Sequence, residues 1–426
     1  MSSTTFRKVL TAGACAAVLG AGLVGCSTST SSGSKNVLTV GTNGGAPMKA
    51  IVAAFEKEHP DVTVEIRDSP ENYLQVTGTQ LTGGTAPDIL QVFPGNGNNV
   101  SPIIAGGRGY FADLSAESWA SEVPESTKPL LSTSDGKLVA VPMTFSSIGV
   151  VYNQGQLDKL GLKQPSTWSE VIQFCSDARA AGKVPFGLGL SDAWTTQLIP
   201  YALTASLVYG QDPDFVKKQT EGSVSFSDSG WRTALDKYLE MEKNKCFNDS
   251  PAGTPYSAVQ DAIRKGDTLA TVTVAAESNT IKETGPKDLQ VSYAAFPATD
   301  IKDENFLSAT TGPSFAVNSK SKNADLAKQF MAWLASPETQ IAYANAYGDT
   351  AAMPGDLKQD SPVAALVNEY ASTEKYSTWP DQLWPSTTVQ PAMFAGIQGM
   401  FSGQDTPESV LKKMDAAYKD QPTAAK

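Results

Sequence analysis

Residues 37–66 read VLTVGTNGGAPMKAIVAAFEKEHPDVTVEI, and this stretch decides the fold class. It begins with a short apolar strand pattern over 37–40 and a glycine-rich turn, and then reaches Pro47, which suits the first turn of a helix. Apolar residues then recur at helical spacing on one face: Met48, Ile51, Val52 and Phe55. Pro60 ends this helix, and residues 62–66 alternate as a half-buried strand does. A strand, a helix and a second strand in this order predict an α/β architecture with largely parallel sheets.

The same alternation of strand and helix patterns continues along the chain. A capping box, formed by Thr167 and Glu170, predicts a helix that runs to about residue 181. Short apolar runs predict further strands over 87–93, 138–141, 148–152 and 268–274. Apolar periodicity and proline positions predict further helices over 231–243, 257–265 and 324–335, and others that begin near 337 and 407.

The N-terminal segment has the layout of an export signal followed by a tether. Two basic residues precede an uncharged apolar run, which predicts a secretory signal peptide over residues 1–25. The last residues of this run and Cys26 resemble the lipobox of bacterial lipoproteins, which implies cleavage before Cys26 and attachment of lipid to its sulfur. Residues 26–36 then form the lipidated cysteine and a flexible Ser/Thr-rich tether. We expect an extracytoplasmic protein anchored to the outer face of the cell membrane. The alternative is an uncleaved membrane helix over 9–25.

Composition limits the other partners. Without residues 1–25 the chain has 401 residues, which suggests about two domains. The same cleavage removes two cations and no acid, so the formal net charge falls from −11 to −13. This acidic balance argues against nucleic acid as a partner, and against the protein body lying on an anionic membrane. We expect a monomer. No segment after residue 25 reaches the roughly 20 apolar residues of a membrane span.

Two cysteines, Cys175 and Cys246, remain after Cys15 is removed with the signal peptide and Cys26 is lipidated. Two cysteines in an exported protein form a disulfide when they meet in the fold, so we expect this pairing. The alternative is a pair of buried free thiols.

Catalytic and cofactor chemistry is poorly supported by the residue types present. The single histidine, His59, lies beside Pro60 in a charged context typical of an exposed helix end. One histidine and two thiols do not make a zinc site, and no phosphate-binding glycine loop is present. We therefore expect no metal, no cofactor and no enzymatic activity. Carboxylates are abundant, but nothing in the sequence singles out a glycosidase pair.

Ten short segments carry a family resemblance: 55–65, 84–89, 135–142, 152–153, 160–162, 165–170, 315–318, 321–323, 327–330 and 336–338. In this order and spacing they resemble the carbohydrate-binding lipoproteins of bacterial ATP-binding-cassette (ABC) importers, the maltose-binding-protein-like family. The resemblance extends over nearly the whole chain after the tether.

The resemblance implies two α/β lobes joined by hinge strands, with a ligand cleft between them. It implies that lobe 1 comprises residues 37–144 and 297–350, and lobe 2 residues 145–296 and 351–426. The lobes of such proteins are expected to close around ligand by hinge motion. The implied partners are a carbohydrate ligand and the transmembrane permease subunits of an importer.

Sugar recognition requires hydrogen-bond partners for the hydroxyls and a flat aromatic surface for the C–H faces. On lobe 1 and at the first crossing, the resemblance and the strand ends point to eight residues: Thr42, Asn43, Asp88, Gln91, Phe93, Asn96, Phe145 and Ser146. Structural alternatives stay open. Thr42 and Asn43 also suit a turn. Asp88 also suits a cap of the local backbone, and Phe93 also suits packing in the core.

On lobe 2 the same reasoning points to five residues: Asp192, Trp194, Glu277, Trp379 and Trp384. Asp192 and Trp194 form a polar and aromatic pair, although Trp194 also suits core packing. Glu277 stands in a segment where many relatives carry a stacking tryptophan, so we expect it to accept a hydroxyl instead. Trp379 and Trp384 lie in a proline-rich loop, and we expect at least one of them to stack on ligand.

These observations predict a lipid-anchored receptor that captures a sugar, with an oligosaccharide the favoured ligand, and presents it to a membrane importer. One alternative keeps the receptor but replaces the sugar with another small solute. Others are an exported glycosidase and a sensory partner of a membrane receptor.

Overall fold

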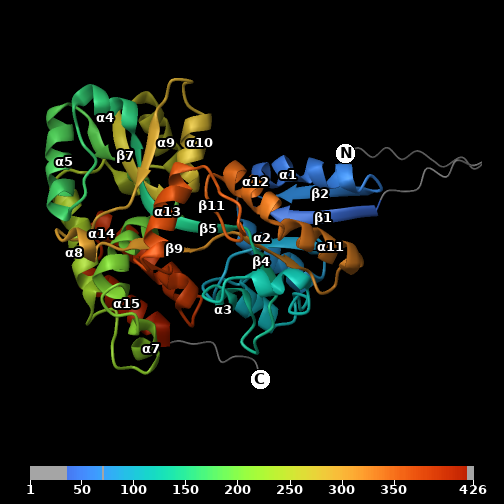
Figure 1. Cartoon of the computed structure of the whole chain (residues 1–426). Helices are drawn as coiled ribbons and strands as arrows, with labels where there is room; N and C mark the ends of the chain where they lie inside the picture. The colour runs from blue at the N-terminus through green and yellow to red at the C-terminus, as the bar shows by residue number, and fades with distance from the viewer. Residues whose placement is uncertain (1–35, 70–71, 420–426) are drawn as a thin grey trace, which may run out of the picture. The chain divides into compact units, whose positions relative to one another are not determined.

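A computed structural model describes residues 36–69 and 72–419 of the chain (Figure 1). Cys26, the predicted signal peptide and the tether up to residue 35 lie outside the described residues, so the predictions about them stay predictions. Within the described ranges, no helix is both long and apolar enough to cross a membrane.

The first sheet contains both strands of the opening sequence stretch. Its strand order is β2-β1-β3-β10-β4, with β1 parallel to both β2 and β3, and β10 antiparallel to β3 and β4. The strands are β1 (Asn36–Thr42), β2 (Val62–Asp68), β3 (Ile89–Val92), β4 (Ala140–Pro142) and β10 (Ser314–Val317). The helices of this lobe are α1 (Gly45–Glu58), α2 (Tyr73–Gly83), η1 (Pro102–Gly106), η2 (Ser118–Glu122), α3 (Lys128–Leu131), α11 (Ala324–Leu334) and α12 (Pro337–Tyr347).

The apolar periodicity of the opening stretch corresponds to a buried helical face. Met48, Ile51, Val52 and Phe55 of α1 are buried. Phe55 packs edge-on against Phe330 of α11, with the ring centroids 4.8 Å apart. The predicted strand–helix–strand unit is therefore confirmed, and its helix packs in the core of lobe 1.

The second sheet has the order β12-β9-β5-β7-β6, and β8 and β11 also pair with β5. Its strands are β5 (Thr144–Asn153), β6 (Val184–Phe186), β7 (Thr268–Val274), β8 (Val291–Ala294), β9 (Leu307–Thr311), β11 (Thr350–Ala351) and β12 (Tyr376–Ser377). The helices before β9 are α4 (Gln154–Leu160), α5 (Trp168–Ala180), η3 (Ala193–Gln197), α6 (Leu198–Thr204), η4 (Ala205–Tyr209), α7 (Phe215–Thr220), α8 (Gly230–Lys243), η5 (Pro251–Gly253), α9 (Tyr256–Lys265), α10 (Ala276–Glu283) and η6 (Lys302–Glu304). Those after β11 are α13 (Pro362–Ser372), η7 (Pro380–Leu383), α14 (Val389–Phe401) and α15 (Pro407–Lys419).

The expectation of largely parallel sheets is wrong for this second sheet. Its central strand β5 is antiparallel to β7, β8, β9 and β11. Only the outer pairs, β6 with β7 and β12 with β9, are parallel. The reason is topological: β5 carries the chain out of the first sheet and β9 carries it back, so the two strands run in opposite directions.

The chain passes between the two sheets at three short connections. β4 ends at Pro142 and β5 begins at Thr144, β9 ends at Thr311 and β10 begins at Ser314, and β11 follows α12. The predicted return to lobe 1 at residue 297 is too early. Strand β9 hydrogen-bonds to β5 over Phe145–Ile148, so residues 307–311 belong to the second sheet and lobe 1 resumes at β10.

A disulfide joins Cys175 of α5 to Cys246, which follows α8. Both residues are fully buried. The bond ties α5 to the segment after α8, and the two cysteines are separated by 71 positions in the sequence.

Candidate functional site

The carboxyl ends of β1 and β3 lie side by side and share one hydrogen-bond network. Gln91 accepts a hydrogen bond from the Thr42 hydroxyl at 2.7 Å, and its Nε2 donates to Asn43 Oδ1 at 2.7 Å. Thr42 and Gln91 are buried, whereas Asn43 is only half-buried. The structure therefore brings together three predicted ligand residues. Thr42 and Gln91 hold the amide of Asn43 in place at the end of the sheet.

The segment after β3 places Phe93 and Asn96 near the same strand ends. Phe93 is half-buried and lies edge-on to Tyr73, with the centroids 6.3 Å apart. The Tyr73 hydroxyl donates to Gln91 O at 2.7 Å, which links Phe93 to the network around Gln91. Asn96 donates its backbone N–H to Gln382 O of lobe 2 at 3.1 Å.

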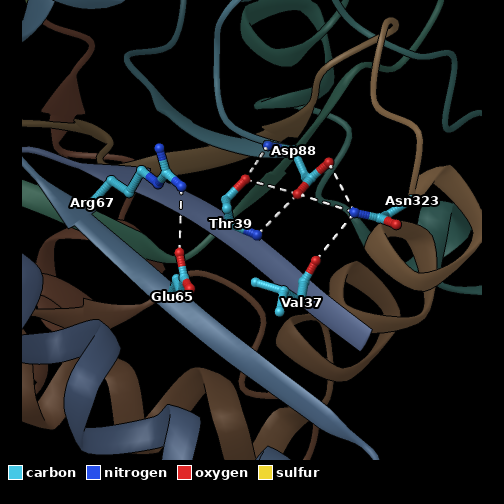
Figure 2. A network of polar contacts seen from close by, with 6 residues as sticks. All are labelled: Val37, Thr39, Glu65, Arg67, Asp88 and Asn323. Atoms are coloured by element: carbon cyan, nitrogen blue, oxygen red, sulfur yellow. Dashed lines mark hydrogen bonds and ion pairs between the residues drawn. The ribbon is translucent and has the colours of Figure 1, made fainter. Parts of the chain in front are cut away.

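Asp88 is a structural residue, which corrects its prediction as a ligand residue. Figure 2 shows its carboxylate between β1 and the loop before α11. The carboxylate accepts hydrogen bonds from Thr39 N (2.9 Å), Thr39 Oγ1 (2.7 Å) and Ser321 Oγ (2.6 Å). Burial alone would raise the pKa of Asp88, but these hydrogen bonds outweigh it and hold the pKa below its usual value. Because donors of the protein occupy both carboxylate oxygens, Asp88 has the role of a backbone cap, which was the alternative left open.

A buried carboxylate lies where the chain crosses between the sheets. Ser146 of β5 donates a hydrogen bond to Asp349, which also accepts the N–H of Thr350 at 2.9 Å. Thr144 Oγ1 lies 3.1 Å from Ser146 Oγ. Burial raises the pKa of Asp349 to about 7, although its hydrogen bonds act to lower it. Ser146, predicted to contact ligand, thus holds the Asp349 side chain at the crossing. Phe145 packs edge-on against Tyr376, with the centroids 5.4 Å apart.

Asp349→Asn is expected to flatten the pH dependence of stability. A carboxyl whose folded pKa lies above its unfolded value of 3.8 makes the native state bind more protons than the unfolded state. Stability therefore falls as pH rises from about 4 to about 7, by at most about 1.4 kcal/mol per pH unit. The amide removes this contribution. Burial also raises the pKa of Asp381, to about 6. This second carboxyl therefore keeps part of the dependence of stability on pH in the variant.

Urea titrations of the wild type and of the Asp349→Asn variant at pH 5, 6, 7 and 8 measure this effect. Asp356→Asn, at an exposed position, is the matched control and is expected to follow the wild type. An unchanged slope in Asp349→Asn would contradict the assignment of the titration to Asp349.

Trp194 is the exposed aromatic side chain on the lobe 2 side. It lies at the start of η3 with 36% of its surface accessible, and it is edge-on to Tyr256 with the centroids 4.9 Å apart. Asp192 Oδ2 accepts the N–H of Tyr256, the first residue of α9, at 2.6 Å. Asp192 therefore ties the loop of Trp194 to the start of α9. The other six tryptophans, all within the described residues, are buried or half-buried.

The remaining lobe 2 predictions have different outcomes. Glu277 accepts a hydrogen bond from Gln260 Nε2 at 2.6 Å, and burial raises its pKa. Trp379 is half-buried and donates from Nε1 to Ser308 O of β9 at 3.3 Å. Trp384 is fully buried in the core of lobe 2. Its prediction as a stacking residue is therefore corrected, because its ring is surrounded by other aromatic rings.

Three residues at the lobe junction were not predicted from the sequence: Asp349, Asp381 and Gln382. Asp381 and Gln382 lie between the two tryptophans of a loop that was expected to bind ligand, so two polar residues in that loop could have indicated a role at the junction. The sequence around Asp349 gives no such indication, since this residue simply follows a helix. Within the described ranges, no cluster of three or more histidine, cysteine or acidic residues is arranged to hold a metal ion.

Residues 39–341 match the family model described as bacterial extracellular solute-binding protein. The chain belongs to this family. This solute-binding protein is 23% identical over 346 residues to the multiple sugar-binding protein of Streptococcus mutans, a match that covers 80% of each chain. It is 22% identical over 377 residues to the melibiose/raffinose/stachyose-binding protein MelE of Bacillus subtilis, covering 87% of this chain and 85% of MelE.

Solved structures share the fold of this chain. The solute-binding protein superimposes on RafE in complex with raffinose with a TM-score of 0.73 at 22% identity, covering 90% of this chain and 98% of RafE. The two-lobed α/β fold expected from the sequence is therefore confirmed. The multiple sugar-binding protein and MelE are both named as binding proteins and not as enzymes.

Proposed function

We propose that this solute-binding protein captures an oligosaccharide between its lobes and delivers it to the permease of an ABC importer. In this proposal lipid on Cys26 holds the protein at the outer face of the membrane. ATP is consumed by other subunits, and the chain itself carries out no covalent chemistry. The names of the multiple sugar-binding protein and of MelE support the ligand class.

The observation that carries the proposal is the exposed ring of Trp194. An exposed aromatic face provides the apolar surface that the C–H groups of a sugar require, and Asp192, two positions earlier in the chain, carries a carboxylate that can accept from its hydroxyls. Across the junction, the amide of Asn43 is held at the strand ends of lobe 1 by Gln91 at 2.7 Å. A ligand that reaches both groups is bound by both lobes, which is the requirement for capture by hinge closure.

Trp194→Ala is expected to weaken binding of raffinose by about 10-fold, equivalent to about 1.4 kcal/mol. The melting temperature of the free protein should change little, because a side chain with 36% exposure contributes less to the core than a buried one. Isothermal titration calorimetry with raffinose, stachyose, maltotriose and arginine measures the affinity and the ligand class. Leu357→Ala, which removes another exposed apolar side chain, is the control and should bind as the wild type does.

The outcomes separate the alternatives. Binding of arginine and of no sugar would move the ligand to another class of solute. Release of monosaccharides from a bound glycan would identify a glycosidase. Wild-type affinity in Trp194→Ala would show that Trp194 does not contact the sugar.

A further inference from the structure

The loop that follows β3 touches lobe 2 through its backbone. Asn96 donates its N–H to Gln382 O at 3.1 Å. A Cβ placed on Gly95 would lie 2.6 Å from Gln382 Cα, and one placed on Gly97 would lie 2.6 Å from Asp381 O. Glycine at both positions is what permits this approach of two main chains. Gly95 also has a φ of +81°, in the left-handed region that favours glycine.

Each side of this contact is fixed to its own lobe. Gly95 donates its N–H to Leu130 O at the end of α3, at 2.7 Å, so the loop is attached to lobe 1. Gln382 is buried, and its side chain is attached to β9 of lobe 2. Its Nε2 donates to Thr311 O at 3.1 Å and its Oε1 accepts from Thr310 Oγ1 at 2.5 Å. A rotation of one lobe against the other must therefore make or break the contact between them.

Gln382 also connects this contact to the crossing itself. Thr310 and Thr311 are the last residues of β9, and only residues 312 and 313 separate them from β10 of the first sheet. The backbone of Gln382 contacts lobe 1 while its side chain holds the strand that leads into the crossing. The contact and the hinge strand are therefore joined through one residue.

The contact contains a buried polar atom that has no hydrogen-bond partner among the described residues. Asn96 Oδ1 is buried without a hydrogen-bond donor. The Asp381 carboxylate lies over Gly97, with Oδ2 3.2 Å from the position of a Cβ on that glycine. Burial raises the pKa of Asp381 to about 6, although the Tyr201 hydroxyl of α6 acts to lower it. A buried amide oxygen without a donor is costly, and a ligand hydroxyl would satisfy the one on Asn96.

We propose that residues 95–97 and 381–382 form a glycine clasp that closes with the lobes, and that Asn96 Oδ1 accepts a hydroxyl of the bound ligand. The second part rests on the proposed function. The clasp adds a main-chain contact to the closed state, and Gln382 couples that contact to β9. Ligand affinity then depends on two glycines that have no side chain with which to touch the ligand.

Gly97→Ala tests the clasp, since the atom nearest to the added methyl group is a backbone oxygen, which cannot turn away as a side chain can. Gly107→Ala is the matched control in the same lobe, because a Cβ there meets no atom within 4 Å and its φ is −60°. Small-angle X-ray scattering gives the radius of gyration of each free protein and of each with raffinose, and calorimetry gives the affinity. We expect Gly97→Ala to have a larger radius of gyration than Gly107→Ala and to bind raffinose about 10-fold more weakly.

The failures are distinguishable. Asn96→Ala is expected to weaken raffinose binding without enlarging the free protein, and wild-type affinity in this variant would remove Asn96 from the ligand site. If the wild type binds no sugar, the proposed function is wrong, and the radii of the free variants still decide the clasp. The clasp would be overturned if Gly97→Ala and Gly107→Ala had equal radii of gyration and, where raffinose binds, equal affinities. Circular dichroism spectra that match the wild type establish that each variant is folded.

Discussion

Replacing Trp384 with alanine is expected to lower the free energy of unfolding by about 3–5 kcal/mol, the range for large buried aromatic residues. The indole is fully buried. Its ring lies among Phe226, Tyr201 and Trp231, with centroid distances of 5.7, 6.1 and 6.2 Å. Removing it leaves a cavity that these rings fill only partly, and the edge-to-face contacts of Tyr201 and Phe226 with it are lost.

Urea denaturation followed by circular dichroism measures this loss, and Trp194→Ala is the matched control. Both variants remove the same side chain, but the Trp194 ring is 36% exposed and packs against a single ring, that of Tyr256. We expect the loss of stability in Trp194→Ala to be less than half of that in Trp384→Ala. Similar losses in the two variants would contradict the placement of Trp384 in the core.

Removal of the disulfide between Cys175 and Cys246 is expected to destabilise the protein by about 4 kcal/mol. The bond closes a loop of 71 residues, and the chain-entropy relation gives this size for such a loop. The loop contains α6, α7 and α8, so the unfolded chain gains considerable freedom when the bond is absent. Both cysteines are fully buried, and alanine at each position avoids placing a new polar group in the core.

The experiment compares the wild type with the Cys175→Ala/Cys246→Ala variant in urea, each with and without a phosphine reductant. The reductant should lower the midpoint of the wild type towards that of the variant and leave the variant unchanged. A wild type that is indifferent to the reductant after complete unfolding, and two titratable thiols in the untreated protein, would show that the cysteines are not paired.

The local elements of the fold were predictable because their causes are local. The apolar face of α1 follows from the spacing of Met48 and Phe55 and their neighbours, and both residues are fully buried. The helix α5 begins where the capping box predicts, with the Thr167 side chain accepting the N–H of Glu170 at 3.3 Å. Such patterns depend on residues within one or two turns of one another, and these are adjacent in the sequence.

The crossings between lobes were less predictable. Residues 307–311 have the same apolar and hydroxyl character as other strands, and nothing in them states which sheet they join. Their pairing with Phe145–Ile148 decides it, over a separation of about 160 positions in the sequence. The antiparallel arrangement around β5 follows from the same long-range pairing, which strand propensities do not encode.

The sequence by itself indicated the α/β class, the positions of seven of the fifteen α-helices in the described residues, the pairing of the two cysteines and the family. Only the tertiary structure decided which predicted residues are free to meet a ligand. Trp194 and Trp384 are the same amino acid, and both were predicted to stack on ligand, but one is exposed and the other is fully buried. Asp88 and Asp192 are likewise indistinguishable as carboxylates, but donors occupy both oxygens of Asp88, whereas Asp192 accepts the N–H of Tyr256 at Oδ2. The physical reason is that exposure and hydrogen-bond satisfaction depend on residues distant in sequence, and the folded chain alone brings those residues together.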